Sequence, residues 1–251
     1  MEREGDWVVA RIEDSVWRLD STQYVDQQLL GNGVFEPEST EWVKEQVKRG
    51  MVVADVGANF GYYTVLLSRL AADSGKVYAF EPSSGFRGRL KGHLQANHCE
   101  NVVVSESALS DEPGTAELFT GDSTGSFLAF AGREPEEVQC MTFDEFVKRN
   151  NVSRLDFMKI DIDGHESKFV AGAAESLRRF QPTILIEFSH LHLLLSGSGS
   201  EELAKQLTGL GYVLYSEKTG RPFKDRIDFL ASALNSTHSA NVFCYPASRA
   251  P

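Results

Sequence analysis

Ionisable side chains gather after two apolar runs in the C-terminal half of the sequence. The run LDFMKID ends in Asp161, and the run PTILIEF has Glu187 as its penultimate residue. Both runs have the length of buried strands, and neighbouring parallel strands bring their carboxyl ends to one rim of a sheet. Further titratable groups surround the two acids: Lys159, Asp163, His165, Glu166 and His190. So many ionisable groups at two strand ends predict a functional site.

His165 is the residue of this set best suited to accept a proton, because an imidazole ordinarily titrates near neutrality. A base of this kind serves reactions in which a hydroxyl must lose its proton to become a nucleophile. The alternative interpretation is that His165 only begins a helix and hydrogen-bonds backbone.

A metal site is a competing interpretation of the same acids. Carboxylate oxygens such as those of Asp161 and Glu187 suit a hard divalent cation. A third clear ligand is missing, because Phe188 follows Glu187 where an amide would serve. His190 could take that place, but imidazole prefers softer metals. We therefore expect no metal and keep Asp161 with Glu187 as the alternative.

A glycine-containing turn follows another apolar run, in MVVADVGANFG at residues 51–61. The run predicts a buried parallel strand, and the next residues, YYTVLLSRLAA, have helical spacing. This order places backbone N–H groups at the carboxyl end of a strand, where open α/β sheets bind nucleotide-like ligands. The residues that would line such a site are Asp55, Gly57, Ala58, Asn59 and Gly61.

Two acids indicate which ligand this turn favours. Asp55 precedes the first glycine, where a carboxylate would repel a diphosphate and attract a cation or an amine. Glu81 ends a second predicted strand, KVYAFEP, about 20 residues after the turn, the usual position of an acid that binds ribose hydroxyls. S-Adenosylmethionine combines a ribose with a sulfonium and an amine. The alternatives are a strand, turn and helix without a ligand, or an NAD site, which Asp55 and Asn59 disfavour.

Five motifs, in this order, resemble the FkbM-type family of S-adenosylmethionine-dependent methyltransferases: DVGANFGYYT, AFEPS, ESALSD, KIDIDGHE and ILIEFS. The resemblance covers roughly residues 30–215. It implies a seven-stranded methyltransferase fold with an antiparallel final strand pair. It also implies, as is usual in the family, O-methylation of a hydroxyl on a natural product or a sugar.

The resemblance implies further cofactor-binding residues. Pro82 follows Glu81 in the AFEPS motif, and Ser107 and Ala108 lie where this type of fold contacts the adenine ring. Glu36 belongs to an aromatic-Glu-Pro stretch similar to those that precede the first strand in family members. We expect Glu36 to face the cofactor or the substrate, with an exposed acid before a helix as the alternative.

Methyl transfer is an in-line displacement at a sulfonium carbon, so an enzyme must align two reactants and deprotonate a hydroxyl. We expect His165 to be the base and Glu187 to orient its imidazole or to bind the substrate hydroxyl. Asp161 would orient the cofactor's amino group or the substrate. Many family members carry another residue at the position of His165, so this role is not transferred from the family as a whole.

The remaining elements would hold these groups in place. Strands alternate with helices, which favours one doubly wound, mostly parallel α/β sheet. Residues 1–50 are expected to form an N-terminal extension that covers the active site, and residues 51–251 the methyltransferase domain. The segments WVVARIE and SVWRLD predict a hairpin in the extension. Its predicted apolar face consists of Trp7, Val9, Trp17 and Leu19.

Composition and charge exclude several classes of partner. The 251 residues carry a net charge of −11, which argues against nucleic acid and against an anionic membrane surface. The densest basic cluster, Arg87, Arg89 and Lys91, is predicted to be a solvated helix face. The three cysteines lack metal-ligand spacing, and the N-terminus lacks the apolar segment of a signal peptide. We therefore expect a cytoplasmic protein.

The sequence leaves the acceptor unnamed. We expect a small-molecule or carrier-bound hydroxyl, such as that of a polyketide intermediate, in a pocket shaped by the N-terminal segment and loop 121–132. A non-catalytic, nucleoside-binding regulatory module is the alternative, and the acids at both predicted sites count against it. A homodimer, and origin from a larger synthase, stay open.

Overall fold

The computed structural model describes residues 2–119, 134–224, 228–229 and 239–251. The chain divides into two compact units. The first unit contains residues 1–106 and 117–138, and the second contains residues 107–116 and 139–251. The predicted domain boundary at residue 50 stays a prediction, and the predicted pocket loop 121–132 lies outside the described residues.

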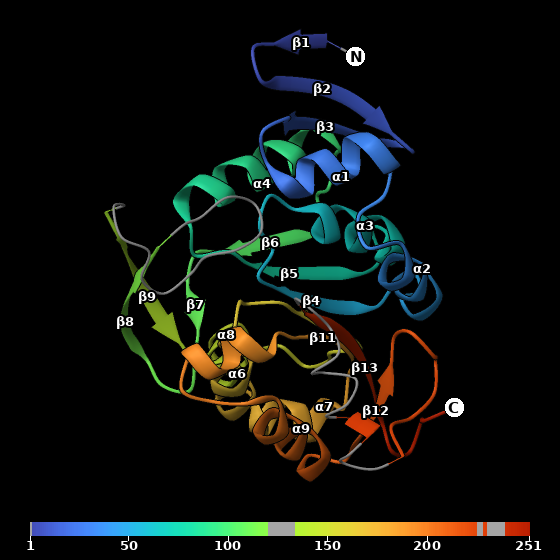
Figure 1. The fold of residues 1–251 in the computed structure, drawn as a ribbon, viewed down its shortest axis with the longest axis vertical. Helices are drawn as coiled ribbons and strands as arrows, with labels where there is room; N and C mark the ends of the chain where they lie inside the picture. Colours follow the sequence, from blue (N-terminus) through green and yellow to red (C-terminus); the bar gives the residue numbers. More distant parts are fainter. Residues whose placement is uncertain (1, 120–133, 225–227, 230–238) are drawn as a thin grey trace. The chain divides into compact units, whose positions relative to one another are not determined.

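The first unit begins with a small antiparallel sheet, drawn in dark blue in Figure 1. Its strands are β1 (Glu2–Glu4), β2 (Trp7–Ile12) and β3 (Ser15–Asp20). Strands β2 and β3 pair as the predicted hairpin, in which Trp7 lies opposite Asp20. The sequence therefore predicted this element correctly.

The predicted apolar face of the hairpin is correct for β3 and wrong for β2. Val8 and Ala10 are buried, opposite the two predicted residues of β3, whereas Val9 is 39% exposed. Side chains alternate between the faces of a strand, so a shift of one residue moves the whole apolar set to the other face. Trp7 and Val9 therefore share the outer face, and Trp7 stacks against the guanidinium of Arg18.

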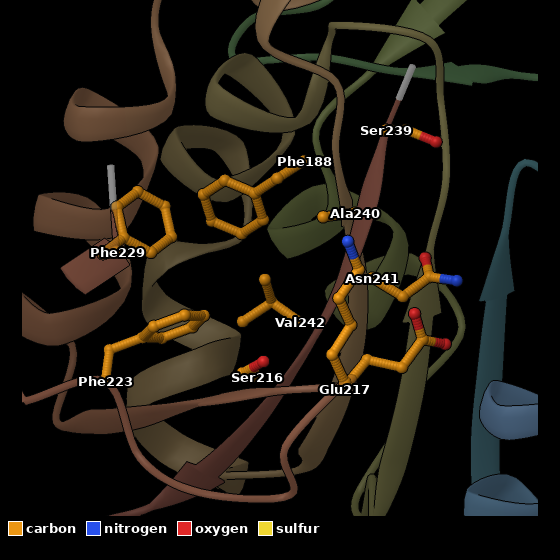
Figure 2. A pocket seen from close by; sticks show the side chains of 10 residues that line it. Phe188, Ser216, Glu217, Phe223, Phe229, Ser239, Ala240, Asn241 and Val242 are labelled. Carbon is orange, nitrogen blue, oxygen red and sulfur yellow. The ribbon is translucent and has the colours of Figure 1, made fainter. Parts of the chain in front are cut away.

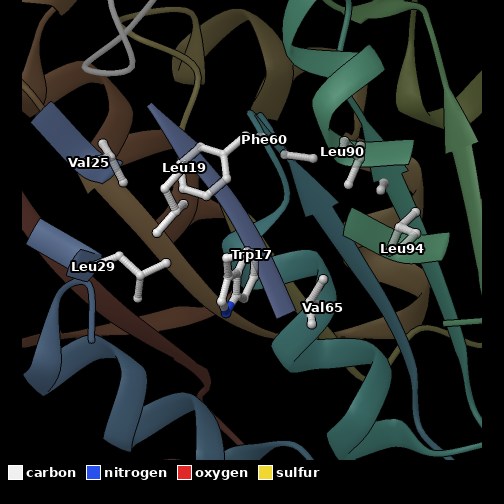
Figure 3. Close-up of a cluster of buried hydrophobic side chains, with 10 residues drawn as sticks. Trp17, Leu19, Val25, Leu29, Phe60, Val65, Leu90 and Leu94 are labelled. Carbon is white, nitrogen blue, oxygen red and sulfur yellow. The ribbon is translucent and has the colours of Figure 1, made fainter. Parts of the chain in front are cut away.

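Three parallel strands, β4 (Val52–Val56), β5 (Lys76–Phe80) and β6 (Val102–Ser105), follow in the first unit. Its helices are α1 (Tyr24–Asn32), α2 (Pro37–Gln46), α3 (Tyr62–Ala71) and α4 (Ser84–Ala96). Figure 3 shows the core that joins the hairpin to these elements, with Trp17 and Leu19 against Phe60 and Leu90. The hairpin thus belongs to the hydrophobic core of the first unit.

The predicted solvated face of α4 is wrong for two of its three basic residues. Arg89 forms an ion pair with Asp26, whose side chain is fully buried in α1. Arg87 donates from Nη1 to the carbonyl oxygen of Pro82 at 2.6 Å, just after β5. Only Lys91 is exposed as expected. The two arginines therefore fix α4 to its surroundings, which no local pattern in the sequence indicates.

A small separate sheet contains β7 (Ala108–Leu109), β8 (Gly114–Leu118) and β9 (Glu136–Met141). In the second unit, β7 runs parallel to the end of β9, so that Ala108 lies opposite Cys140. The apolar segment 101–111 is thus divided between β6 and β7.

The second unit contains four strands of the large sheet. Strands β10 (Phe157–Ile160) and β11 (Thr183–Phe188) are parallel. Strand β13 (Ala240–Pro246) lies antiparallel between β11 and β12 (Tyr212–Ser216). With the three strands of the first unit, they make the mostly parallel seven-stranded α/β sheet that the sequence and the family resemblance predicted.

Five helices are described in the second unit: α5 (Phe143–Arg149), α6 (Glu166–Gly172), α7 (Ala174–Phe180), α8 (His190–Leu195) and α9 (Ser200–Gly209). Helix α6 ends at Gly172, and α7 begins at Ala174. Helix α8 was not predicted. In the described part of the chain, no helix is both long and apolar enough to cross a membrane.

Replacing Gly172 with alanine is expected to destabilise the second unit. A Cβ at this position would lie 2.0 Å from the backbone oxygen of Ser110, so backbone must shift. Overpacking of this kind costs about 1–3 kcal/mol, which would lower the melting temperature by several degrees.

Gly92 offers a matched control, because an added Cβ in the middle of α4 meets nothing within 4 Å. Gly92→Ala should leave stability unchanged or raise it by up to about 1 kcal/mol, through the better helix propensity of alanine. Thermal or urea unfolding measures both variants. Equal stability of the two would contradict the packing described for Gly172.

Candidate active site

The turn after β4 is held by buried polar groups and by unusual backbone conformations. Asp55 is fully buried in β4, and its Oδ2 accepts a hydrogen bond of 2.6 Å from the hydroxyl of Thr64 on α3. Asn59 and Gly61 both have positive φ, at 51° and 101°, a region that glycine adopts readily and asparagine tolerates. The chain therefore reverses sharply between the strand and the helix.

Glu81 follows β5 and lies beside this turn. One oxygen of its carboxylate accepts the N–H of Asn59 at 2.7 Å, and the other accepts the N–H of Ser83 at 2.9 Å. The side chain is only 5% exposed, and this burial raises the pKa of Glu81 to about 7, to which the negative charge of Asp55 also contributes. The structure thus brings together the two acids and the turn that the sequence singled out.

Glu36 lies in the first unit and contacts α3. It precedes α2 with a left-handed backbone, φ 45°, and its carboxylate accepts a hydrogen bond of 2.8 Å from the hydroxyl of Tyr63. Burial, followed by the charge of Glu36, raises the pKa of Tyr63 well above its ordinary value. The sequence did not indicate Tyr63 as a partner, because the two residues are far apart in the chain.

The other predicted cofactor residues are divided between the units. Pro82 directly follows Glu81 in the first unit, and its carbonyl is bound by Arg87. Ser107 and Ala108 belong to the second unit, where Ala108 is part of β7.

In the second unit, Asp161 directly follows β10 and is paired with a lysine from that strand. The ammonium of Lys159 lies 2.9 Å from Oδ2 of Asp161, and the lysine side chain is almost fully buried. This ion pair fixes the carboxylate of Asp161 at the end of the strand.

Glu166 holds the loop that follows Asp161. Its Oε1 accepts N–H groups from Ile162 at 3.1 Å and from Gly164 at 3.3 Å. The side chain is fully buried, and burial raises its pKa to about 7. Among the residues that the structure describes, Oε2 of Glu166 is buried without a hydrogen-bond partner. Such an atom is costly unless a cation or a donor compensates it.

His165 precedes the first residue of α6, and its imidazole makes no capping hydrogen bond to the helix. Burial and the nearby charge of Lys168 lower its pKa, while Asp111 acts in the opposite direction. The imidazole is therefore mainly neutral near pH 7, the form in which it can accept a proton. This is the state that the predicted base requires.

Glu187 lies among other acids. Burial is the main cause that raises its pKa well above the ordinary range, and the charges of Asp161, Asp163 and Glu166 add to it. The histidine that the structure brings to Glu187 is His192 of α8: single ligand atoms of Asp163, Glu187 and His192 all lie within 4.8 Å of one another. Asp161, the other acid of the alternative metal pair, is not part of this group, and that alternative stays a prediction.

His190, the substitute ligand considered from the sequence, has a different partner. Its Nδ1 lies 3.2 Å from the hydroxyl of Ser200. The sequence missed His192 because HLHLLL was not predicted as a helix, and only the helix carries His192 back to the strand end. A second histidine two residues after His190 was the available signal.

A comparison with protein families gives the decisive observation. The family model described as "Methyltransferase FkbM domain" matches residues 55–214. The chain belongs to the FkbM methyltransferase family. The matched range contains the turn after β4, Glu81 and both acidic strand ends, and it confirms the family resemblance found in the motifs.

Solved structures of methyltransferases share the fold of this FkbM chain. An FkbM methyltransferase from Methylobacillus flagellatus is 14% identical with a TM-score of 0.50; the match covers 82% of this chain and 50% of that one. An S-adenosylmethionine-dependent O-methyltransferase from Thermotoga maritima is 13% identical with a TM-score of 0.51, covering 90% and 72%. An rRNA methylase candidate from Clostridium thermocellum is 11% identical with a TM-score of 0.52, covering 83% and 93%. No curated protein matches the chain.

The FkbM chain also has an aromatic pocket in its second unit, shown in Figure 2. Phe188 and Phe223 both pack edge-on against Phe229, with ring centroids 5.2 Å apart in each pair. Glu217 and Asn241 add polar groups to the lining. Successive residues of a strand point to opposite faces, so Glu187 faces away from the side of β11 that Phe188 occupies.

Removing the charge of Glu81 should change how stability depends on pH. The pKa of Glu81 is raised from 4.5 to about 7 in the folded protein, so folding favours the protonated carboxyl. This contribution is fully present below the unfolded value and is lost as the pH rises through 7. Relative to wild type, Glu81→Gln should therefore gain stability between about pH 5 and pH 8, by up to about 3 kcal/mol.

Urea unfolding at several pH values measures this difference. The glutamine side chain can accept a hydrogen bond from only one of the two N–H groups that Glu81 binds. The pH dependence of the stability difference is therefore more informative than the absolute stability of the variant. A difference between variant and wild type that stays constant over this pH range would contradict the raised pKa.

Proposed function

We propose that this FkbM-family chain is a cytoplasmic, S-adenosylmethionine-dependent O-methyltransferase. Its acceptor would be a small-molecule or carrier-bound hydroxyl, on a natural product, a polyketide intermediate or a sugar. The observation that carries the proposal is the buried carboxylate of Glu81 beside the turn of Asp55, Asn59 and Gly61.

The donor set at this turn fits a nucleoside with a cationic tail. Each oxygen of Glu81 accepts one backbone N–H, so further lone pairs are left for the two hydroxyls of a ribose. Asp55 adds negative charge beneath the turn, which favours a cation over a diphosphate. When bound, S-adenosylmethionine would supply a methyl group on a sulfonium.

The residues of the second unit suit the acceptor side of the reaction. A neutral His165 would take the proton of the acceptor hydroxyl, which makes the oxygen a nucleophile. The ion pair of Lys159 and Asp161 would orient groups at the strand end, and Glu187 would bind the hydroxyl. This division follows from the chemistry of the side chains.

The charge of the chain supports a small acceptor. One structural neighbour is an rRNA methylase candidate, but RNA binding depends on neutralising phosphates with clustered lysine and arginine. This chain has a net charge of −11. In its densest basic cluster, on α4, Arg87 and Arg89 are already engaged in contacts within the protein.

Calorimetric titration tests the donor site. Wild type is expected to bind S-adenosylmethionine and S-adenosylhomocysteine but not NAD. Glu81→Ala should weaken binding by about 10-fold to 100-fold, because hydrogen bonds to a charged group are lost. Asp73→Ala, which changes an exposed acid before β5, is the matched control and should bind as wild type does. Binding of NAD, or equal affinity of Glu81→Ala and wild type, would contradict the assignment.

A paired histidine substitution tests the base. His165→Asn should lower the turnover number for methyl transfer by about 100-fold to 10,000-fold and leave the affinity for S-adenosylmethionine unchanged. His98→Asn is the control, because His98 is exposed with φ 54°, a conformation that asparagine accepts well. An unchanged turnover number in His165→Asn would remove the base assignment while leaving the donor site intact.

A further inference from the structure

We propose that Asp163, Glu187 and His192 form a binding site for one divalent transition-metal cation such as Mn²⁺ or Zn²⁺. The three residues come from three elements of the second unit: the loop after β10, strand β11 and helix α8.

The spacing of the ligand atoms suits a shared ion. One ligand atom from each residue lies within 4.8 Å of the other two. Nδ1 of His192 and Oδ1 of Asp163 are 3.9 Å apart, too far for a hydrogen bond. Ligands that each bind one ion at about 2.0–2.2 Å lie roughly 3–4 Å from one another, so small side-chain rotations would complete the coordination.

The backbone holds two of these ligands against each other. Asp163 and Gly164 both have positive φ, at 52° and 96°, which turns the loop toward α8. A Cβ at Gly164 would lie 2.4 Å from the backbone oxygen of His192, so the loop and the helix touch at a position that only glycine allows. Glu166 fixes the same loop through the N–H groups of Ile162 and Gly164. The loop that carries Asp163 is therefore held against the helix that carries His192.

The residues around Asp163, Glu187 and His192 carry negative charge, which favours binding of a cation. Asp161, Asp163 and Glu166 all act on Glu187 through their charges, and Lys159 is engaged by Asp161. An independent observation points the same way: among the described residues, Oε2 of the fully buried Glu166 has no hydrogen-bond partner. Asp163, Glu187 and His192 are half-buried, and several carboxylates close together and partly removed from water are stabilised by protons or by a positive ion.

The mixed ligand set indicates the kind of metal. Mg²⁺ and Ca²⁺ favour oxygen ligands only, whereas an imidazole with two carboxylates suits Mn²⁺, Fe²⁺ or Zn²⁺. Three protein ligands leave at least one coordination position open. If the proposed function holds, an acceptor hydroxyl in that position would lose its proton to water or to a side-chain base more readily. Its oxygen would then form a bond to the methyl carbon as the bond from that carbon to the sulfonium breaks, and S-adenosylhomocysteine would leave as a neutral thioether. This role rests on the proposed function, but metal binding does not.

Metal titration of the full-length protein, without a methyl donor, tests the site. After treatment with a chelator, wild type should bind one Mn²⁺ or one Zn²⁺ per chain in equilibrium dialysis. His192→Gln and Asp163→Asn should each weaken that binding by at least about 10-fold, since a direct ligand is lost. His190→Gln is the matched control on the same helix, because the ring of His190 lies against Ser200, and it should bind metal as wild type does.

Two results would overturn the proposal: no stoichiometric binding of either ion to wild type, or equal affinity of His192→Gln and wild type. Circular dichroism of each variant distinguishes loss of a ligand from loss of folding. The electron paramagnetic resonance spectrum of bound Mn²⁺ would report on an imidazole ligand even in a variant of reduced stability. Because no methyl donor is present, failure here leaves the proposed methyl transfer standing. Failure of donor binding, in turn, leaves the metal result unaffected.

Discussion

The hydrogen bonds that hold the carboxylate of Glu81 are the interaction on which the candidate donor site depends. A carboxyl group at the end of a buried strand is destabilised by the loss of water. Here two backbone N–H groups, from Asn59 and Ser83, replace part of that hydration. The same two bonds tie the turn after β4 to the start of α4. The position of the turn and the protonation state of Glu81 therefore depend on the same two hydrogen bonds.

The second unit repeats this arrangement with different residues. Glu166 is fully buried and accepts two N–H groups of the loop after β10, as Glu81 does for the turn after β4. Burial raises the pKa of each acid to about 7. Each unit thus contains a glutamate that shapes a loop at a strand end and exchanges a proton near neutral pH. Both loops carry residues that the proposed chemistry uses.

Local patterns in the sequence predicted the elements around these loops. The apolar run before Gly57, the helical spacing after Gly61 and the interval to Glu81 together defined the turn, because each is a property of neighbouring residues. The seven-stranded sheet followed from the alternation of strands and helices together with the family resemblance.

Contacts between distant residues could not be predicted in this way. The hairpin was found, but a one-residue difference in phase decides whether Val8 or Val9 is buried, and both are valine. The bond from Tyr63 to Glu36 and the approach of His192 to Glu187 depend on how whole elements pack. Helix α8 is short and begins without a capping hydrogen bond, so it left little signal in the sequence.

A crystal structure of the protein with S-adenosylhomocysteine would test the central claim most directly. Both ribose hydroxyls are expected to lie within hydrogen-bond distance of the Glu81 carboxylate, with the turn from Gly57 to Gly61 against the ligand. A ribose bound elsewhere, while Glu81 contacts only Asn59 and Ser83, would contradict it and reduce Glu81 to a structural acid of the turn.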